Sequence, residues 1–393
     1  MLRMVATAFL LYTLPFSLLA QESMLSKSDM VKLDFKILAE KKQHLQAHKV
    51  AYTWLLKKCD SLLSFQPVSV MQKAGMPPSG DKHDYMSIAP YSWPDTTKPG
   101  GVPYINRDGQ VNPEVLQYQD KTNITRLCTN VYLLGLAYYY SGEKKYAAHA
   151  AELLRAWFLD PATKMNPNLN FGQAVKGVTT GRPYGMIETR NLVFLIDGLD
   201  LIKTSGAWSG QDQAGMQEWV RQFLQWAQTS KLGREEMNGT NNHGVWYDAQ
   251  TLSMAIFLDS ADLASSIIAR AEGRLDKQMD STGFFPLEMK RTTSLHYSVF
   301  ILNAFYVVAQ LAEERGTDFW NVRTPSGKSL RQAFEVLLPY MEKEKTWTGP
   351  QIEPFEYRDA VPILLRSIEH YGCTSCRGAI SRIDEGDLLI DLL

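Results

Sequence analysis

Apolar residues recur three or four positions apart along most of the chain, which is the spacing of one face of an α-helix. The pattern is clearest in Leu127, Val131, Leu134 and Tyr138, where Ser141-Gly142 ends the predicted helix. An earlier helical stretch covers about 25–64. Later ones cover about 146–158, 192–202, 216–226, 242–258, 260–277, 300–311, 334–341 and 355–370. The alternation typical of β-strands is nearly absent, so the sequence predicts an all-α protein.

Two long segments interrupt the helices, at 65–122 and 159–186. Both are rich in Pro, Gly or Asn, and loops of that length are usually functional. The helices between them follow one another as antiparallel pairs without a fixed repeat period. We therefore expect an incomplete (α/α) toroid, with aromatic-rich loops over a central cleft, rather than an array of identical repeats.

The N-terminus has the features of a secretory signal. Arg3 precedes an apolar run from Val5 to Leu19, and Ala20-Gln21 is a plausible cleavage point. The run is shorter than a membrane-spanning helix requires, although an uncleaved anchor is the alternative. We expect a signal peptide at 1–20, one toroid domain at 21–375 and a surface tail at 376–393. The mature protein would be periplasmic or secreted and not attached to a membrane.

The overall charge excludes one class of partner. Lys and Arg number 41 and Asp and Glu number 42, for a net charge of -1. No global basic field would hold nucleic acid, so we expect no nucleic-acid partner. The four cysteines and seven scattered histidines form no metal motif, so we expect no metal or other cofactor. Cys373 and Cys376 could form a disulfide, a redox pair or two free thiols. We expect a monomer.

The most distinctive cluster is Asn241-Asn242-His243, which comes just before a predicted helix. Asn at a helix start is ordinarily a cap, which is the simplest explanation. Amide N–H groups at a helix N-terminus also favour an anion, and imidazole moves protons near neutral pH. Trp246 follows in the same run and has a face suited to a sugar ring.

A second cluster holds Arg291, His296 and Tyr297. Arg291 can bind a carboxylate with two hydrogen bonds, or it can be an ordinary surface residue. Glu288 lies close by and could orient Arg291 or simply pair with it. Tyr297 could act as an acid or a base, although a base role requires a lowered pKa. A Tyr packed in the core is the alternative.

The long loops carry further candidates for contact with a sugar polymer. Tyr91, Trp93 and Arg107 lie in the first loop, whose rings could stack on sugars or pack against one another. The second loop contributes the polar residues Gln173, Arg182 and Tyr184, and then Glu188, which could cap the next helix or pair with Arg190.

One reaction that uses this set of residues is β-elimination in a polyuronide. Removing the hydrogen at C5 creates negative charge beside the C6 carboxylate, which Asn242, His243 and Arg291 could neutralise. Tyr297 could take this proton and protonate O4 when the C5 hydrogen and O4 lie on the same face of the sugar. Where they lie on opposite faces, His243 could be the base and Tyr297 the acid.

These residues resemble the alginate lyase superfamily of α/α-toroid polysaccharide lyases. The resemblance rests on Asn242-His243, on the Arg291 to Tyr297 segment, and on the Tyr91-Ser92-Trp93-Pro94 and Arg107-Asp108-Gly109 loops, and it covers roughly 80–345. Within this superfamily the chain most resembles polysaccharide lyase family thirty-eight, and it resembles the family five alginate lyases more distantly. The resemblance implies catalytic roles for Asn242, His243, Arg291 and Tyr297. It also implies that Gln173, Arg182 and Tyr184 contact substrate.

The sequence therefore predicts a lyase that cleaves β-1,4-linked polyuronides and leaves a 4,5-unsaturated sugar. The expected partner is an anionic polysaccharide, with alginate first and glucuronan second. Tyr91, Trp93, Arg107, Trp246 and His296 are expected to complete the substrate contacts. A non-catalytic glycan-binding protein would keep the aromatic loops but would need neither His243 nor Tyr297. A glycoside hydrolase on the same toroid would require an essential pair of carboxylates.

Overall fold

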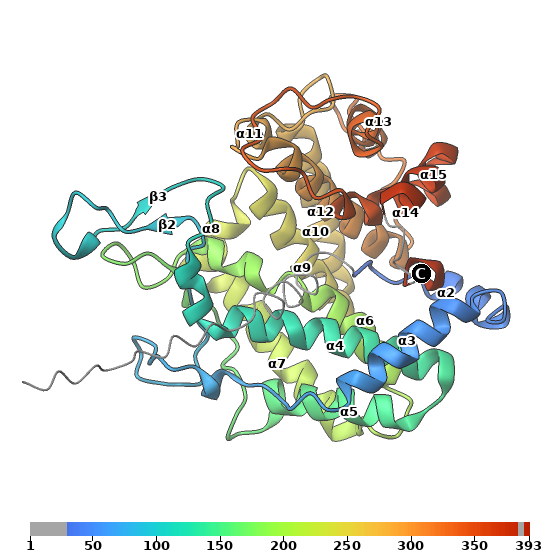
Figure 1. The fold of residues 1–393 in the computed structure, drawn as a ribbon, viewed down its shortest axis with the longest axis horizontal. Helices are drawn as coiled ribbons and strands as arrows, with labels where there is room; N and C mark the ends of the chain where they lie inside the picture. Colours follow the sequence, from blue (N-terminus) through green and yellow to red (C-terminus); the bar gives the residue numbers. More distant parts are fainter. Residues whose placement is uncertain (1–29, 384–388) are drawn as a thin grey trace, which may run out of the picture.

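The structure is a computed structural model that describes residues 30–383 and 389–393. Its framework is a series of helical hairpins, each with one inner and one outer helix (Figure 1). The inner helices are α4 (Gln119–Ser141), α6 (Leu192–Ile202), α9 (Asn242–Phe257), α12 (Ser294–Glu314) and α14 (Val361–Tyr371). The outer helices are α5 (Lys144–Leu154), α7 (Gly210–Thr229), α10 (Ala261–Gln278), α13 (Leu330–Met341) and α15 (Thr374–Ile383).

Each inner helix packs on the next one along the chain, from α4 through α6, α9 and α12 to α14. The outer helices pack on this inner layer, as α5 does on α4 and α10 on α9. Nearly every residue of α6 and α9 is buried, whereas α7 and α10 bury one stripe, as outer helices should. The arrangement confirms the predicted all-α class and the incomplete (α/α) toroid.

The remaining elements are short or lie at the edges of the toroid. Helices α2 (Phe35–Gln43) and α3 (Lys49–Leu62) precede α4, while α8 (Lys231–Met237) and α11 (Pro286–Met289) each lead into an inner helix. The strands are β1 (Met86–Ile88), β2 (Ser92–Trp93), β3 (Ile105–Asn106) and β4 (Phe171–Ala174). β1 pairs with β4 in parallel, which joins the two long loops, and β2 pairs with β3 in an antiparallel hairpin. Figure 1 shows this hairpin extending away from the helical body.

The first described residues contact several inner helices of the toroid. The buried ammonium of Lys32 bonds to Asp197 of α6 at 2.6 Å and to Glu314 at the end of α12 at 2.5 Å. Its backbone carbonyl accepts hydrogen bonds from Gln310 and Arg366. One buried residue thus ties together three inner helices, α6, α12 and α14.

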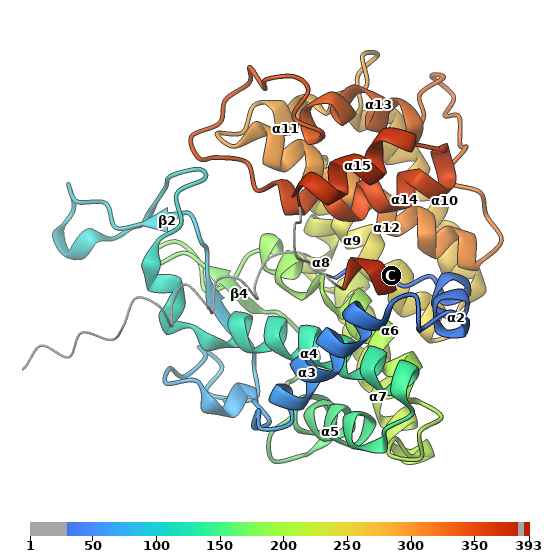
Figure 2. The same cartoon turned by 45° about the vertical axis from the view of Figure 1, so that its right-hand side comes forward.

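The predicted surface tail over 376–393 is wrong for the residues that the structure describes. Cys376 lies within α15 and is fully buried. Leu389, Leu392 and Leu393 are buried too, and Tyr140 donates a hydrogen bond to the carbonyl of Leu392. The chain end lies beside α2 and α3 in both Figure 1 and Figure 2. Burial of these leucine side chains stabilises the fold, because it removes apolar surface from water.

Other sequence predictions have separate outcomes. The predicted signal peptide, 1–20, lies outside the described residues. Cys373 and Cys376 form a disulfide, which the sequence had left open. Among the described helices, α12 is long and apolar enough to cross a membrane, but 78% of its apolar window is buried inside the protein. Burial of that extent is typical of a core helix.

Candidate active site

The Asn241-Asn242-His243 cluster lies where the predicted helix begins. The side chain of Asn241 accepts a hydrogen bond from the backbone N–H of His243 at 3.2 Å, so Asn241 is the N-cap of α9. The capping explanation therefore holds for Asn241. Asn242 and His243 occupy the first turn of the helix, and their side chains bond to other parts of the protein.

His243 is oriented by a carboxylate that the sequence analysis did not identify. Its Nδ1 lies 2.6 Å from Oε1 of Glu236, a buried residue near the end of α8. Because a carboxylate accepts hydrogen bonds, this contact places a proton on Nδ1 and leaves Nε2 of a neutral imidazole as the acceptor. The imidazole is thus prepared to take a proton through Nε2.

Three predicted substrate contacts extend from His243 as a chain. The ring of Tyr184 lies 4.5 Å from the imidazole of His243, and the guanidinium carbon of Arg182 lies 4.9 Å from the centre of the Tyr184 ring. Arg182 donates to Oε1 of Gln173 at 2.7 Å. Burial lowers the pKa of Arg182, and its buried Nε–H has no hydrogen-bond partner within the described structure. The structure therefore brings Gln173, Arg182, Tyr184 and His243 together, and it leaves the buried Nε–H of Arg182 without a partner in the described structure.

Asn242 faces Glu288 of α11. Oε1 of Glu288 accepts the backbone N–H of Asn242 at 2.7 Å, and Oε2 accepts its Nδ2 at 2.9 Å. Glu288 thus binds Asn242. Arg291, its predicted partner, acts on Glu288 only through its positive charge. Burial raises the pKa of Glu288, although Arg291 and His243 act to lower it. Asn242 is 0% exposed, so it lies beneath the surface of the site and holds its first turn in place.

Tyr297 forms the centre of a second group. Its hydroxyl lies 2.8 Å from the hydroxyl of Tyr91, and the guanidinium carbon of Arg291 lies 3.6 Å from the centre of its ring. Burial, followed by the neighbouring Tyr91, raises the pKa of Tyr297 above its ordinary value, against the opposing charge of Arg291. The phenol is therefore protonated in the free protein at neutral pH.

Arg291 binds a carboxylate of the protein itself. Its guanidinium forms a two-pronged ion pair with Asp108, and Asp108 also accepts the backbone N–H of Thr292 at 3.1 Å. These partners hold the pKa of Asp108 below its ordinary value, although partial burial acts in the opposite direction. The ion pair fastens the loop after β3 to the segment before α12, and with it the loop that carries Tyr91.

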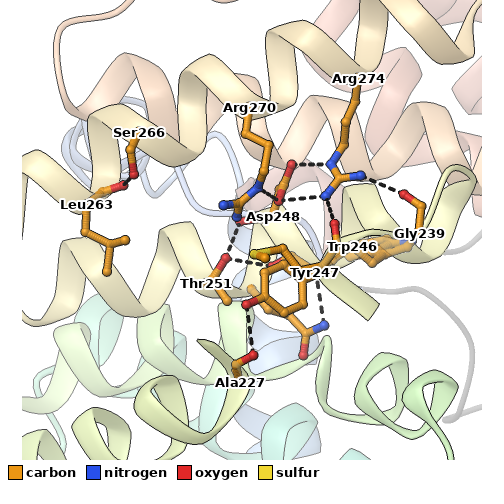
Figure 3. A network of polar contacts seen from close by, with 12 residues as sticks. Ala227, Gly239, Trp246, Tyr247, Asp248, Thr251, Leu263, Ser266, Arg270 and Arg274 are labelled. Carbon is orange, nitrogen blue, oxygen red and sulfur yellow. Dashed lines mark hydrogen bonds and ion pairs between the residues drawn. The ribbon is translucent and has the colours of Figure 1, made fainter. Parts of the chain in front are cut away.

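A buried ionic network supports the turn that carries His243 (Figure 3). Asp248 of α9 accepts from Arg270 at 2.8 Å and from Arg274 at 2.6 Å, both on α10. Arg274 also donates to the carbonyl of Gly239 at 2.6 Å and to that of Met237. Since Glu236 precedes this turn and His243 follows it, Arg274 fixes the spacing between the two.

The other predicted contacts have different surroundings. Trp93 and Arg107 face each other on the β2–β3 hairpin, with the guanidinium carbon 5.2 Å from the indole. His296 is half-exposed, with Nδ1 3.2 Å from a carboxylate oxygen of Asp359. The prediction for Trp246 is wrong, because its side chain is buried against Phe300 and presents no face to a sugar.

Glu188 also differs from its predicted role. Its carboxylate accepts hydrogen bonds from the hydroxyls of Tyr85 at 2.7 Å and Ser87 at 2.5 Å. It therefore neither caps α6 nor pairs directly with Arg190. Ser87 in turn accepts the backbone N–H of Gln173 at 2.7 Å, so this buried carboxylate supports the loop that carries Gln173 and Arg182.

One group of side chains has the composition of a metal site. Glu342, Cys373 and Cys376 place their ligand atoms within 4.8 Å of one another. Both sulfur atoms are bonded to each other, which removes the thiolates that would hold a metal.

Sequence reasoning missed Glu236 and gave Asp108 no role of its own. Glu236 lies seven positions before His243, on a separate short helix, and Asp108 lies 183 positions before Arg291. A local signal existed for Glu236, since a carboxylate shortly before an Asn-His turn can fold back onto the imidazole. No local signal existed for Asp108, because its pairing depends on the toroid bringing two loops together.

Comparisons with known proteins show what the chain is similar to. The family model described as alginate lyase matches residues 69–347. The crystal structure of an alginate lyase from Bacteroides ovatus superposes with a TM-score of 0.86 and 35% sequence identity, covering 93% of this chain and 99% of that one.

More distant structures share the fold. A histidine-to-alanine variant of alginate lyase A1-III, complexed with a tetrasaccharide, matches with a TM-score of 0.55 and 14% identity, covering 84% of this chain and 88% of that chain. The A1-III lyase from Sphingomonas species A1 matches with a TM-score of 0.50 and 15% identity, covering 87% and 88%. No curated protein sequence matches this chain. The family model spans most of the chain and the Bacteroides structure nearly all of it, so this protein belongs to the alginate lyase family of polysaccharide lyases.

Proposed function

We propose that the protein cleaves alginate by β-elimination, using His243 and Tyr297 to move protons and Arg182 to neutralise the substrate carboxylate. The observation that carries the proposal is the arrangement around His243. A buried carboxylate fixes the Nδ1–H form of the imidazole, and a cation with an unpartnered donor lies next to the Tyr184 ring that packs on it. Membership in the alginate lyase family supports the choice of polymer.

Arg182 suits carboxylate neutralisation better than the residues first predicted for it. Arg291 already pairs with Asp108, and the carboxamide of Asn242 is buried against Glu288. Arg182 is held by the neutral side chain of Gln173 and keeps a free Nε–H. A guanidinium aimed at the C6 carboxylate would stabilise the charge that develops when the C5 proton leaves.

The protonation states favour a division of labour between His243 and Tyr297. Nε2 of His243 can accept the C5 proton, and Glu236 stabilises the imidazolium that results. Tyr297 is protonated in the free protein and can give its proton to O4. This division suits guluronate, in which the C5 hydrogen and O4 lie on opposite faces of the ring. In mannuronate and glucuronate they lie on the same face, and there Tyr297 would have to exchange both protons.

The carboxylates of the site count against a hydrolase. A glycoside hydrolase needs two carboxyl groups that flank the scissile bond. Glu236 is bound to His243, Glu288 to Asn242 and Asp108 to Arg291. Each of these three carboxylates is thus engaged in positioning another side chain.

The test is an assay of the purified protein on polymannuronate, polyguluronate and glucuronan, following the ultraviolet absorbance of the new C4=C5 double bond. Tyr297→Phe should abolish the signal on every polymer that the wild type cleaves. His243→Gln should reduce cleavage of polyguluronate more than that of polymannuronate. Retention of full activity by Tyr297→Phe, or equal losses on both polymers in His243→Gln, would overturn the assigned roles.

We further propose that the mature protein acts outside the cytoplasm as a monomer. The Cys373–Cys376 disulfide supports an oxidising compartment, as does the size of the polymeric substrate. Sequencing the N-terminus of protein recovered from a periplasmic fraction would test the location and the cleavage after Ala20. Light scattering would test the monomer.

A further inference from the structure

Arg190 is a cation that the mechanism above does not use. It lies just before α6, and its guanidinium carbon is 5.5 Å from the centre of the Phe300 ring of α12. The one hydrogen bond that its guanidinium makes to the described part of the chain is a long one, 3.3 Å to the carbonyl of Ile187. Partial burial lowers the pKa of Arg190.

The carboxylates near Arg190 are committed to other groups. Asp359 and Glu188 act on Arg190 through their charge, without a direct ion pair to it. Asp359 pairs with His296, and Glu188 accepts from Tyr85 and Ser87. A partly buried guanidinium with no bonded carboxylate can donate hydrogen bonds to an incoming anion.

The surroundings of Arg190 resemble a sugar-binding wall. The imidazole of His296 stacks on Phe300 with ring centres 5.9 Å apart and planes only 10° apart. The side chain of His296 is 39% exposed, so part of its ring can meet a ligand. Arg190 and the ring of His296 both contact Phe300. Together they provide the two contacts that a uronate needs, one for its carboxylate and one for its ring.

The position of this group relative to Tyr297 indicates which sugar it would bind. Arg190 connects to Tyr297 through Phe300, whose ring centre is 6.5 Å from that of Tyr297. The guanidinium on the Tyr297 ring itself belongs to Arg291, and Arg182 is the cation proposed to bind the carboxylate at the cleaved bond. A carboxylate bound there would belong to a sugar beyond the two that the scissile bond joins.

We infer that Arg190 and His296 form a subsite for the carboxylate and ring of a uronate residue outside the cleaved pair. The inference rests on the proposed lyase function and adds a binding position to it. A bidentate, charge-assisted contact of this kind is worth about tenfold to hundredfold in affinity. The subsite should therefore improve cleavage of chains long enough to reach it and have no effect on shorter ones.

The experiment compares wild type and Arg190→Met on purified oligouronates of increasing length, from trisaccharide to hexasaccharide. Methionine keeps the apolar contact with Phe300 and removes the charge. We expect kcat/KM of the variant to fall about tenfold or more on the longer oligomers and to match the wild type on the shortest oligomer that is cleaved. Arg221→Met is the matched control, because Arg221 is an exposed arginine on the outer helix α7 that pairs with Glu218; it should match the wild type at every length.

Thermal stability separates a ligand-binding cation from a structural one. Arg190→Met should not lower the melting temperature, because the free protein loses a desolvated charge and no bonded ion pair. An equal fractional loss of kcat/KM at every length together with a lower melting temperature would assign Arg190 a structural role and overturn the subsite. Wild-type kinetics at every length would overturn it as well. A wild type inactive on all polymers would instead refute the proposed function.

Discussion

Replacing Glu236 with Gln tests how His243 is activated. The carboxylate is 2% exposed, Oε1 lies 2.6 Å from Nδ1 of His243, and Oε2 has no hydrogen-bond partner within the described structure. Gln has nearly the same shape and can still accept a hydrogen bond from Nδ1. The change therefore removes the negative charge while leaving the packing in place.

The size of the effect follows from the kind of hydrogen bond that is lost. A hydrogen bond to a charged group contributes about 1.5–3 kcal/mol and a neutral one about 0.5–1.5 kcal/mol. The difference, about 1–2 kcal/mol, is felt mainly when His243 becomes an imidazolium by taking the C5 proton. It corresponds to a fall in kcat of about 5- to 30-fold. Stability should stay equal or rise, because a buried charge with one unpartnered oxygen is removed.

Steady-state kinetics on polyguluronate and polymannuronate measure this effect. Glu236→Gln should lower kcat on polyguluronate, where His243 is the proposed base, more than on polymannuronate. Glu235→Gln is the control, since Glu235 is the adjacent exposed carboxylate on the same helix and should behave as wild type. An unchanged kcat on polyguluronate in Glu236→Gln would refute the reasoning that its charge supports His243.

Further predictions concern the framework and the pH profile. Gly244→Ala should lower the free energy of unfolding by about 1–3 kcal/mol and reduce kcat, because a Cβ there would overlap a backbone carbonyl and the guanidinium of Arg274. Asp248→Asn should cost about 3–5 kcal/mol in urea unfolding, since it leaves buried arginines without their carboxylate; a loss below 1 kcal/mol would contradict that view. The raised pKa of Tyr297 keeps the phenol protonated past pH 10, so the alkaline decline of kcat/KM from this group should lie above that pH. Tyr91→Phe removes a hydrogen bond that raises this pKa and should move the decline to lower pH; an unmoved profile would show that Tyr297 is not the acid.

The helices were predictable because their signals are local. The apolar spacing through Leu127 and Tyr138 predicted α4, and Gly142 ends that helix in a left-handed conformation (φ 73°) that glycine adopts freely. Asn241 caps α9 as a local reading of the sequence suggested. Each of these features depends on residues within a few positions of one another.

The errors arose where long-range packing decides the outcome. Trp246 has the composition of a sugar platform, but α9 is an inner helix surrounded on nearly all sides, so its indole is buried. The pairing of Arg291 with Asp108, across 183 positions of sequence, was not expected, and the role of Arg291 toward a substrate carboxylate stays a prediction. The end of the chain contains acidic residues, yet Leu392 is buried beside α3. No local pattern could have revealed these contacts.

The measurement that tests the central claim most directly is cleavage of polyguluronate and polymannuronate in water enriched in oxygen-18, with the products analysed by mass spectrometry. A β-elimination breaks the C4–O4 bond without adding water, so the account predicts 4,5-unsaturated products that carry no label from the cleavage. These products should disappear in Tyr297→Phe. Saturated products with one labelled oxygen for each bond broken would show hydrolysis and contradict the account.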